Sequence, residues 1–398
     1  MMSATTMGYG VRARERMPFA WDIITLGLVA ALLLVGLVMV TSASMSVAAK
    51  DLGDPFYYLE RQFLFGLCGV LAAWVVTRVP AEQWEKHSLA LLLLGLALLL
   101  LVLIPGLGAK INGARRWMRI GPMNFQVSEL AKVLVLTWIC SYCVRKRAEL
   151  EQTFAGLLKP VGLLGVAGVL LLLEPDFGAA TVLFATGFAV LFVAGARLRY
   201  VFMLVSAVAA AFAVLALTSA YRLKRLTVFL HPWDDPFNGG FQLTQSLIAI
   251  GRGEWFGVGL GASVQKLFYL PEAHTDFLFA VLAEELGLAG VALTLALFLG
   301  LIWRSFFIAR LACGAGLKFA SYLAAGFGLW LGIQAFINIG VNMGVLPTKG
   351  LTLPLMSYGR SSLIVSMAWV GLVLRVYHEA THEARGSATA RAASEHCA

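Results

Sequence analysis

The chain has 398 residues, of which 60% are hydrophobic and only 13% are charged. Soluble globular domains usually carry about 25% charged residues, so this composition excludes an ordinary soluble protein and indicates a membrane protein. The formal net charge of +9 suits an anionic membrane surface or an anionic substrate, and the five cysteines are too scattered for a disulfide framework.

The first predicted element is a membrane helix that follows a basic tail. Arg12, Arg14 and Arg16 precede an apolar run from Ile23 to Val40. This run is longer than the apolar core of a signal peptide, and many more spans follow it. We therefore expect a cytoplasmic tail over residues 1–20 and a transmembrane domain over residues 21–377.

Further apolar runs follow along the chain. Each helical span of a bilayer needs roughly 20 mostly apolar residues. Lipid-exposed backbone must satisfy its own hydrogen bonds, which favours helices, and the short alternating strands of a porin-like barrel are missing. The sequence predicts an all-α, polytopic fold of about ten transmembrane helices, centred on residues 32, 69, 135, 166, 186, 208, 290, 331 and 365 and on the run Leu89 to Ile104.

Basic residues in the loops predict the orientation. With both termini in the cytoplasm, the short external loops are poorer in Lys and Arg than the cytoplasmic connections, and residues 106–126 are the exception. This outer loop carries Lys110, Arg115, Arg116 and Arg119, which we interpret as groups placed to meet an anion. The cytoplasmic basic residues are Arg78, Lys86, Arg145, Lys146, Arg147, Lys159, Arg197, Arg199, Arg304, Arg310 and Lys318.

Two long polar segments lie late in the chain. The segment from about Tyr221 to Thr275, between spans seven and eight, is predicted to be one large extracytoplasmic loop. Its many aromatic residues and glycines are unlike a disordered chain, so we expect amphipathic segments that pack over the bundle. Residues 378–398 are polar and alanine-rich, and we expect a disordered cytoplasmic tail.

Two groups of polar residues fall within the predicted spans. Glu129 and Lys132 stand three residues apart and share one helix face, either as a mutually satisfied pair or as the wall of a polar cavity. Gln334, Asn338 and Asn342 follow an i, i+4, i+8 spacing. They form a stripe that either makes interhelical hydrogen bonds or lines a cavity.

Asp276 lies where the large loop meets the eighth span. A carboxylate there is partly desolvated yet reachable from the outer surface, which suits a general base. The alternative is that Asp276, or Thr275 beside it, caps the helix. For Glu284 and Glu285, further along the span, we expect hydrogen bonding inside the bundle.

The outer loops also suggest an anion site. Lys349 precedes the last span and, with Arg115 and Arg116, would form an electropositive mouth for a phosphate or pyrophosphate. The sequence has no Walker A motif, no GxSxG elbow and no HExxH zinc motif.

Several motifs together resemble the SEDS family of cell-wall synthases, from about Trp21 to Val376. The match is to the division-type members rather than the elongation-type members. One departure is Arg360, because the division-type pattern reads SYGGSS where this chain has Ser357 to Ser362. The motifs are Asn112 to Trp117, Gln126 to Glu129 with Lys132, Gln242 to Ser246, Leu270 to Asp276 and Gly350 to Pro354.

This resemblance implies a glycosyltransferase that polymerises lipid II, an undecaprenyl-pyrophosphate-linked disaccharide-pentapeptide. It implies that Asp276 is the catalytic acid of the family pattern and that Glu129 and Lys132 are its cavity-lining pair. For substrate binding we also expect Arg115, Arg116, Lys349, His274 and Ser357. No cofactor is expected with certainty, and a divalent cation, Mg or Mn, at Asp276 stays open because no closed ligand set is visible.

Two other functions are open on the sequence alone, namely a lipid II flippase and a non-catalytic division scaffold. The resemblance further implies a class B penicillin-binding protein as partner and regulators of the FtsQ–FtsL–FtsB type. It implies the bacterial inner membrane at the division septum as the location. We expect no nucleic-acid partner.

Overall fold

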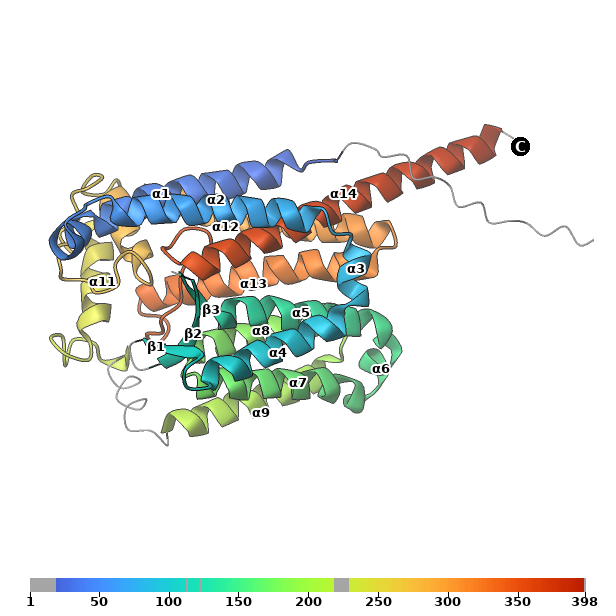
Figure 1. Ribbon diagram of the computed structural model, residues 1–398, viewed down its shortest axis with the longest axis horizontal. Helices are drawn as coiled ribbons and strands as arrows, with labels where there is room; N and C mark the ends of the chain where they lie inside the picture. Colours follow the sequence, from blue (N-terminus) through green and yellow to red (C-terminus); the bar gives the residue numbers. More distant parts are fainter. Residues whose placement is uncertain (1–18, 112–113, 122, 218–228, 397–398) are drawn as a thin grey trace, which may run out of the picture.

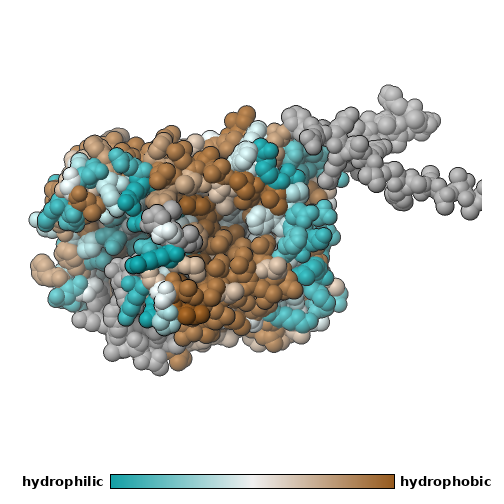
Figure 2. All heavy atoms as spheres, viewed as in Figure 1, coloured by the Kyte–Doolittle hydropathy of each residue, from teal (hydrophilic) through white to brown (hydrophobic). Residues whose placement is uncertain are grey.

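The computed structural model describes residues 19–111, 114–121, 123–217 and 229–396. Most of the predicted N-terminal tail, including its three arginines, lies outside these residues. Long helices run side by side along one axis, and a small sheet and several loops gather at one end (Figure 1). In Figure 2, hydrophobic residues cover the middle of the visible face, and hydrophilic residues gather toward its two ends.

The helices confirm the predicted polytopic fold. Seven described helices are long and apolar enough to cross a membrane, and three shorter apolar helices join them. Each of the ten lies at a predicted position. They are α1 (Ile23–Leu52), α2 (Tyr57–Thr77), α4 (Ser88–Leu103), α5 (Val127–Arg145), α7 (Phe154–Leu173), α8 (Phe177–Val193), α9 (Leu198–Leu217), α12 (Leu278–Gly314), α13 (Lys318–Asn342) and α14 (Arg360–His396).

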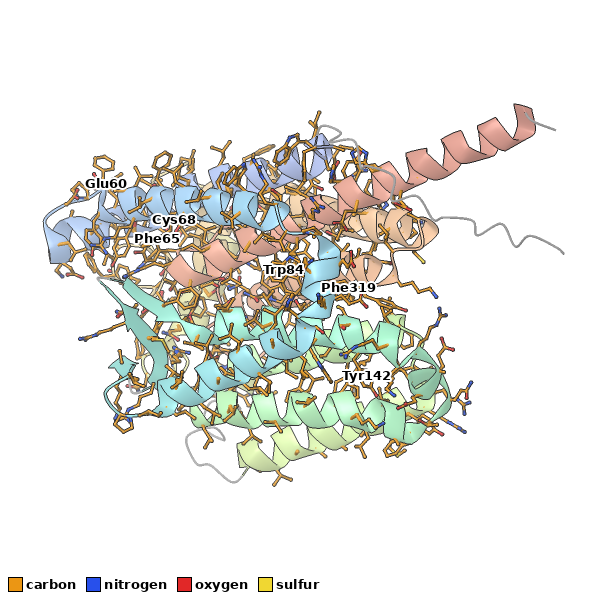
Figure 3. All side chains as sticks on the ribbon, turned by 45° about the vertical axis from the view of Figure 1, so that its right-hand side comes forward. Glu60, Phe65, Cys68, Trp84, Tyr142 and Phe319 are labelled. Atoms are coloured by element: carbon orange, nitrogen blue, oxygen red, sulfur yellow. The ribbon has the colours of Figure 1, made fainter. Side chains whose placement is uncertain are left out.

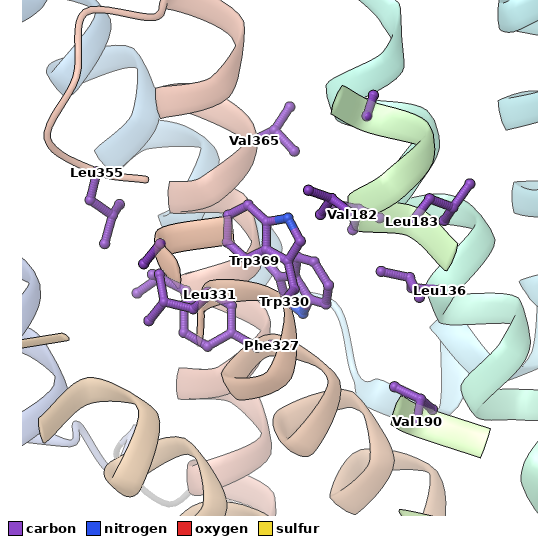
Figure 4. Packing of buried hydrophobic residues seen from close by; sticks show 14 of the residues in the cluster. Leu136, Val182, Leu183, Val190, Phe327, Trp330, Leu331, Leu355, Val365 and Trp369 are labelled. Atoms are coloured by element: carbon purple, nitrogen blue, oxygen red, sulfur yellow. The ribbon is translucent and has the colours of Figure 1, made fainter. Parts of the chain in front are cut away.

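Helix α5 forms the buried centre of the bundle, where nearly every side chain from Val127 to Cys143 is shielded. Aromatic residues of α13 and α14 pack beside it. Trp330 and Trp369 stack with ring centroids 5.0 Å apart, and Phe327 meets Trp369 at 5.7 Å (Figure 4). These large rings fill the interior at mid-depth.

Short helices connect spans at the end away from the sheet. Helix α3 (Ala81–Lys86) carries Trp84 and crosses that end beside α13, near Phe319, while α6 (Arg147–Gln152) follows α5 (Figure 3). At the opposite end lies the amphipathic helix α11 (Phe241–Arg252), which packs on α12. This agrees with the amphipathic segment expected in the large loop, of which residues 221–228 lie outside the described part.

A three-stranded antiparallel sheet was not predicted from the sequence. Strands β1 (Gly108–Ile111), β2 (Ala114–Ile120) and β3 (Met123–Gln126) lie in the order β1-β2-β3. The basic outer loop thus pairs its own backbone groups. Because α5 begins directly after β3, the sheet is fixed to the most buried helix.

Helix α12 is interrupted at Gly287, where the backbone is not helical (φ 63°, ψ −162°). Residues 254–259 fill the interruption. The amides of Val258 and Gly259 donate to the carbonyls of Glu284 and Glu285, at 2.9 and 3.1 Å, and the amide of Leu288 donates to the carbonyl of Glu254 at 2.9 Å. The large loop is therefore bonded into the helix that follows Asp276.

The end of the chain differs from the disordered tail predicted for residues 378–398. Helix α14 continues to His396. Its first turns beyond residue 377 are packed, because Ala380 is buried and the His378 ring stacks on Phe19 at 4.3 Å. Alanine is the strongest helix former, so the alanine-rich sequence supports the helix.

Candidate active site

A cavity of about 280 Å³ opens at the end of the bundle that holds the sheet. Its wall is formed by strands β2 and β3, the first turns of α5 and α14, and the segments that directly precede α8, α12 and α14. The residues that line it are Arg116, Trp117, Gln126, Glu129, Asp176, Glu272, Thr275, Asp276, Gly350, Leu351, Thr352, Tyr358, Gly359, Arg360, Ser361 and Ser362.

Asp276 lies in this cavity, two residues before α12 begins. The N-cap position of α12 is Phe277, and no side chain caps the helix, so the capping alternative is not supported. A Cβ atom on Gly350 would lie 2.9 Å from Asp276 Oδ2, so the absence of a side chain there lets the loop lie against the carboxyl.

The proton affinity of Asp276 is set by its surroundings. Burial, and then the charge of Glu272, raise the pKa of the Asp276 carboxyl to about 7, while Arg116 opposes them. A carboxyl group with a pKa near neutrality is well matched to accept a proton at physiological pH. The geometry therefore fits the general-base alternative.

Glu129 and Lys132 lie at the start of α5. Lys132 Nζ donates to Glu129 Oε1 at 2.9 Å and to Gln334 Oε1 at 3.4 Å, and both members of the pair are buried. Glu129 also lines the cavity, and its Oε2 atom has no hydrogen-bond partner among the described residues. The pair thus combines the two alternatives, since it is mutually bonded and one member forms the cavity wall.

Arg116 is the predicted cation that reaches the cavity. Arg115 is adjacent in strand β2 but is not among the residues that line the cavity. Arg116 approaches Asp176 at 4.0 Å, and its Nε atom is buried without a hydrogen-bond partner in the described structure. A guanidinium with an unused donor in a cavity is suited to an anionic ligand.

Three other predicted binding residues lie outside the lining. Lys349 Nζ donates to Thr181 Oγ1 at 3.0 Å, and burial lowers the pKa of this lysine. His274 packs its ring 4.4 Å from that of Tyr58. Ser357 Oγ accepts a hydrogen bond from the Leu353 amide at 3.0 Å. These contacts are structural, and they hold the segments that carry Asp276 and Gly350.

Asp176 was missed from the sequence. Its carboxylate accepts hydrogen bonds from Ser128 Oγ at 2.9 Å, from Gln126 Nε2 at 3.2 Å and from the Ala179 amide at 3.0 Å, which caps α8. Nearby, burial and then the charge of Asp176 raise the pKa of Glu174 to about 9. The sequence did contain a signal for this part of the site, because Glu174 and Asp176 are two acidic residues between adjacent apolar spans at the predicted outer end.

Arg360 adds a second cation to the lining. It begins α14, and its guanidinium lies 6.0 Å from the centre of the Phe65 ring. The bulky side chain is therefore accommodated over an aromatic face. The Tyr358 hydroxyl, also in the wall, is buried, which raises its pKa, and the charge of Arg360 opposes that rise.

The described residues contain no group of three or more His, Cys, Asp or Glu side chains arranged to hold a metal ion. The cavity carboxylates Asp176 and Glu129 are instead bonded to Ser128, Gln126 and Lys132. The alternative of a cation at Asp276 thus finds no matching ligand set within the described ranges.

Comparison with known proteins places the chain in a family. A family model described as a cell cycle protein, FtsW/RodA/SpoVE, matches residues 23–382. This chain belongs to the FtsW/RodA/SpoVE family. The match spans α1 to α13, most of the apolar part of α14 and the whole cavity wall, and it confirms the family resemblance found in the sequence motifs.

Curated relatives share more than half of their residues with this FtsW/RodA/SpoVE member. A protein of Thioalkalivibrio sulfidiphilus is 58% identical over 351 residues, covering 88% of each chain. A protein of Nitrosococcus halophilus is 57% identical, covering 89% of this chain and 92% of the relative. Both are named probable peptidoglycan glycosyltransferase FtsW, which supports the division-type match.

Solved structures share the fold. A chain from a peptidoglycan synthase complex that coordinates polymerization and crosslinking superposes with a TM-score of 0.74 at 33% identity, covering 91% of this chain and 99% of that one. RodA of Thermus thermophilus gives a TM-score of 0.67 at 32% identity, covering 90% and 97%.

Proposed function

We propose that this chain is a peptidoglycan glycosyltransferase that polymerises lipid II into glycan strands for the septal wall. The observation that carries the proposal is Asp276, a carboxyl with a pKa near 7 in an outer-end cavity that also holds Arg116. The names of the relatives, at 58% and 57% identity, support the reaction class.

In the proposed step, the 4-hydroxyl of an acceptor sugar attacks the anomeric carbon of a donor. The new C–O bond forms as the bond to the lipid pyrophosphate breaks, and Asp276 takes the hydroxyl proton. General-base catalysis of this kind typically contributes about 10²- to 10⁴-fold to the rate. A single displacement inverts the anomeric configuration.

Charge develops on the departing pyrophosphate, and the cavity offers two cations to meet it. Arg116 presents an unused buried donor, and Arg360 lies in the same wall. Positioned guanidinium groups stabilise developing phosphate charge in a water-poor site. We assign both arginines to the pyrophosphate, while Lys132 stays bonded to Glu129 below the cavity.

A flippase is the competing function, because it too would need a polar cavity for lipid II. Below the cavity, however, Gln334 is followed one turn deeper by Trp330, which stacks on Trp369. Phe327 packs against both tryptophans, so these rings form a buried cluster between α13 and α14 (Figure 4). The described packing therefore offers a site at one end rather than a passage, which favours chemistry over transport.

The proposed setting follows from the same relatives. We propose that the chain works in the bacterial inner membrane at the septum. There it would be paired with a class B penicillin-binding protein that crosslinks the new strands, under regulators of the FtsQ–FtsL–FtsB type. The structural likeness to a chain from a peptidoglycan synthase complex that coordinates polymerization and crosslinking supports a partner of this kind.

The test is a polymerisation assay with labelled lipid II on the purified protein and its transpeptidase partner. We expect glycan ladders from the wild type and none from Asp276→Ala. Asp51→Ala is the matched control, because Asp51 is an exposed acid at the same end of the bundle. Ladders from Asp276→Ala would move the base elsewhere, and ladders from neither protein in a confirmed complex would favour the flippase or the scaffold.

A further inference from the structure

We propose that Asn338 and Asn342 are positioning residues that hold Asp276 in its working geometry, an inference that rests on the proposed function. Both lie on α13, in a stripe that the sequence alone left open between helix packing and cavity lining. Neither side chain lines the cavity. Their amides contact the main chain of the segments that do.

Asn338 joins two cavity segments that are distant in the sequence. Its Nδ2 donates to the carbonyl of Asp276 at 2.9 Å and to the carbonyl of Leu351 at 2.5 Å. Leu351 follows Gly350, whose backbone lies against the Asp276 carboxyl. One side-chain amide thus fixes the base and the loop that packs on it relative to each other.

Asn342 supports the same carbonyl from one turn further along α13. Its Nδ2 donates to the Asp276 carbonyl at 3.0 Å and to the Asn338 carbonyl at 2.8 Å, while its Oδ1 accepts from the Ala280 amide at 3.2 Å. Because the Ala280 amide can only donate, Oδ1 must face it, and the NH₂ group must face the carbonyls. The orientation of the Asn342 side-chain amide is therefore fixed by partners at both its oxygen and its nitrogen.

The two asparagines tie the start of α12 to α13 at the residue that carries the base. The side chain of Asn338 is 2% exposed and that of Asn342 is fully buried, so these bonds do not compete with water. Misplacing a catalytic group by about 1 Å can cost on the order of 100-fold in rate. Positioning therefore accounts for two buried amides that converge on one carbonyl.

Gln334, the third amide of the stripe, makes different contacts. Its Nε2 donates to the Thr352 carbonyl at 3.1 Å, and its Oε1 accepts from Lys132, but it makes no recorded bond to Asp276. If the stripe served helix packing alone, all three amides would be equivalent in their effect on Asp276. The positioning hypothesis separates the two asparagines from Gln334.

The experiment uses the full chain with its transpeptidase partner, as wild type, Asn338→Ala and Asn342→Ala, two variants that are informative independently. Thr294→Val is the control, because Thr294 is a buried residue of α12 whose hydroxyl, among the described residues, donates to the Gly290 carbonyl of its own helix. The measurements are kcat, KM for lipid II, the pH profile of kcat and the thermal midpoint of unfolding.

We expect each asparagine variant to lower kcat by roughly 10- to 100-fold with little change in KM. The acid limb of the pH profile should move down by about half a pH unit, since a loosened Asp276 becomes more hydrated. Thr294→Val should leave the acid limb of the pH profile where it is in the wild type, even if this variant is less stable. An unchanged limb in folded Asn338→Ala and Asn342→Ala would overturn the inference and leave only a packing role.

A second readout separates this inference from the proposed function. Carbodiimide-driven amine labelling of Asp276, followed by peptide mass spectrometry across pH, reports the protonation of its carboxyl without any turnover. If the wild type makes no glycan, the proposed function fails, yet a lowered labelling midpoint in the asparagine variants would still support positioning. Equal midpoints would overturn it whether or not the wild type is active.

Discussion

At the scale of the residue, the proton affinity of Asp276 predicts how activity depends on pH. Its raised pKa of about 7 means that the carboxylate forms as the pH rises through neutrality, so the rate should fall below pH 7. Glu272 raises this pKa and Arg116 lowers it. We expect Glu272→Gln to move the acid limb down and Arg116→Gln to move it up, each by roughly half a unit.

The measurement is the pH profile of glycan formation, read at its midpoint so that losses of maximal rate do not interfere. Asp51→Asn, which removes an exposed acid at the same end, should leave the midpoint in place. A shift of the same sign in Glu272→Gln and Arg116→Gln would contradict the assignment of the limb to Asp276.

The presence of Asp276, Glu129 and Arg116 in the candidate site could be predicted because each breaks an expectation for a membrane protein. Two are acids in or beside apolar spans, and the third is a cation in an outer loop. Asp176 could not be predicted in the same way, because its place in the site depends on hydrogen bonds from Ser128 and Gln126, some fifty positions earlier in the chain. Sequence spacing reports neighbours along one helix but not contacts between helices.

At the scale of the element, the break in α12 explains how the large loop is held. Glu285 accepts from Lys266 at 2.7 Å and from Ser42, while Glu284 accepts from Arg252 at 3.3 Å. Both acids are fully buried, and each is paired, as buried charges must be to avoid a large desolvation cost. The hydrogen-bonding role expected for them is met, although the partners come from the loop and from α1.

The break in α12 predicts how a methyl group added at Gly287 changes the stability of the protein. Gly287 adopts a conformation that is open essentially to glycine alone, and a Cβ atom there would lie 2.3 Å from the Gly257 amide nitrogen. We expect Gly287→Ala to lower the free energy of unfolding by about 2 kcal/mol or more. Thermal unfolding in detergent measures the change.

Gly314→Ala is the matched control, because Gly314 ends the same helix and a Cβ there would meet nothing within 4 Å. Its expected effect is neutral or slightly stabilising, as for other glycines replaced in helices. Equal losses in the two variants would mean that the loop does not depend on the break.

The same scale shows why the sheet was not predicted. Residues 106–126 hold glycines and four basic side chains, and their strands are short. Short polar strands carry little hydrophobic periodicity, whereas the ten described helices can be predicted from long apolar runs. The span positions were therefore predictable, and the folding of the loop between α4 and α5 was not.

At the scale of the whole molecule, the sheet and α11 lie at one end of the bundle (Figure 1), and the cavity opens there. The short connections at the other end carry basic residues such as Arg78, Lys146 and Arg197. The positive-inside trend predicts that the second end faces the cytoplasm. The cavity then opens on the outer side, where a lipid-linked sugar would be polymerised. Orientation is thus a condition of the proposed function.

Cysteine labelling measures this orientation. Cys313 is exposed in the last turn of α12, at the predicted cytoplasmic end, whereas Cys140 and Cys143 are buried. In a Cys397→Ser background, an impermeant maleimide should label Cys313 in inside-out vesicles but not in spheroplasts. Ala262→Cys, placed in the exposed outer loop of a chain that also carries Cys313→Ser, should show the opposite pattern. The reverse of both patterns would put the Asp276 cavity on the cytoplasmic side and remove the proposed reaction from the outer surface.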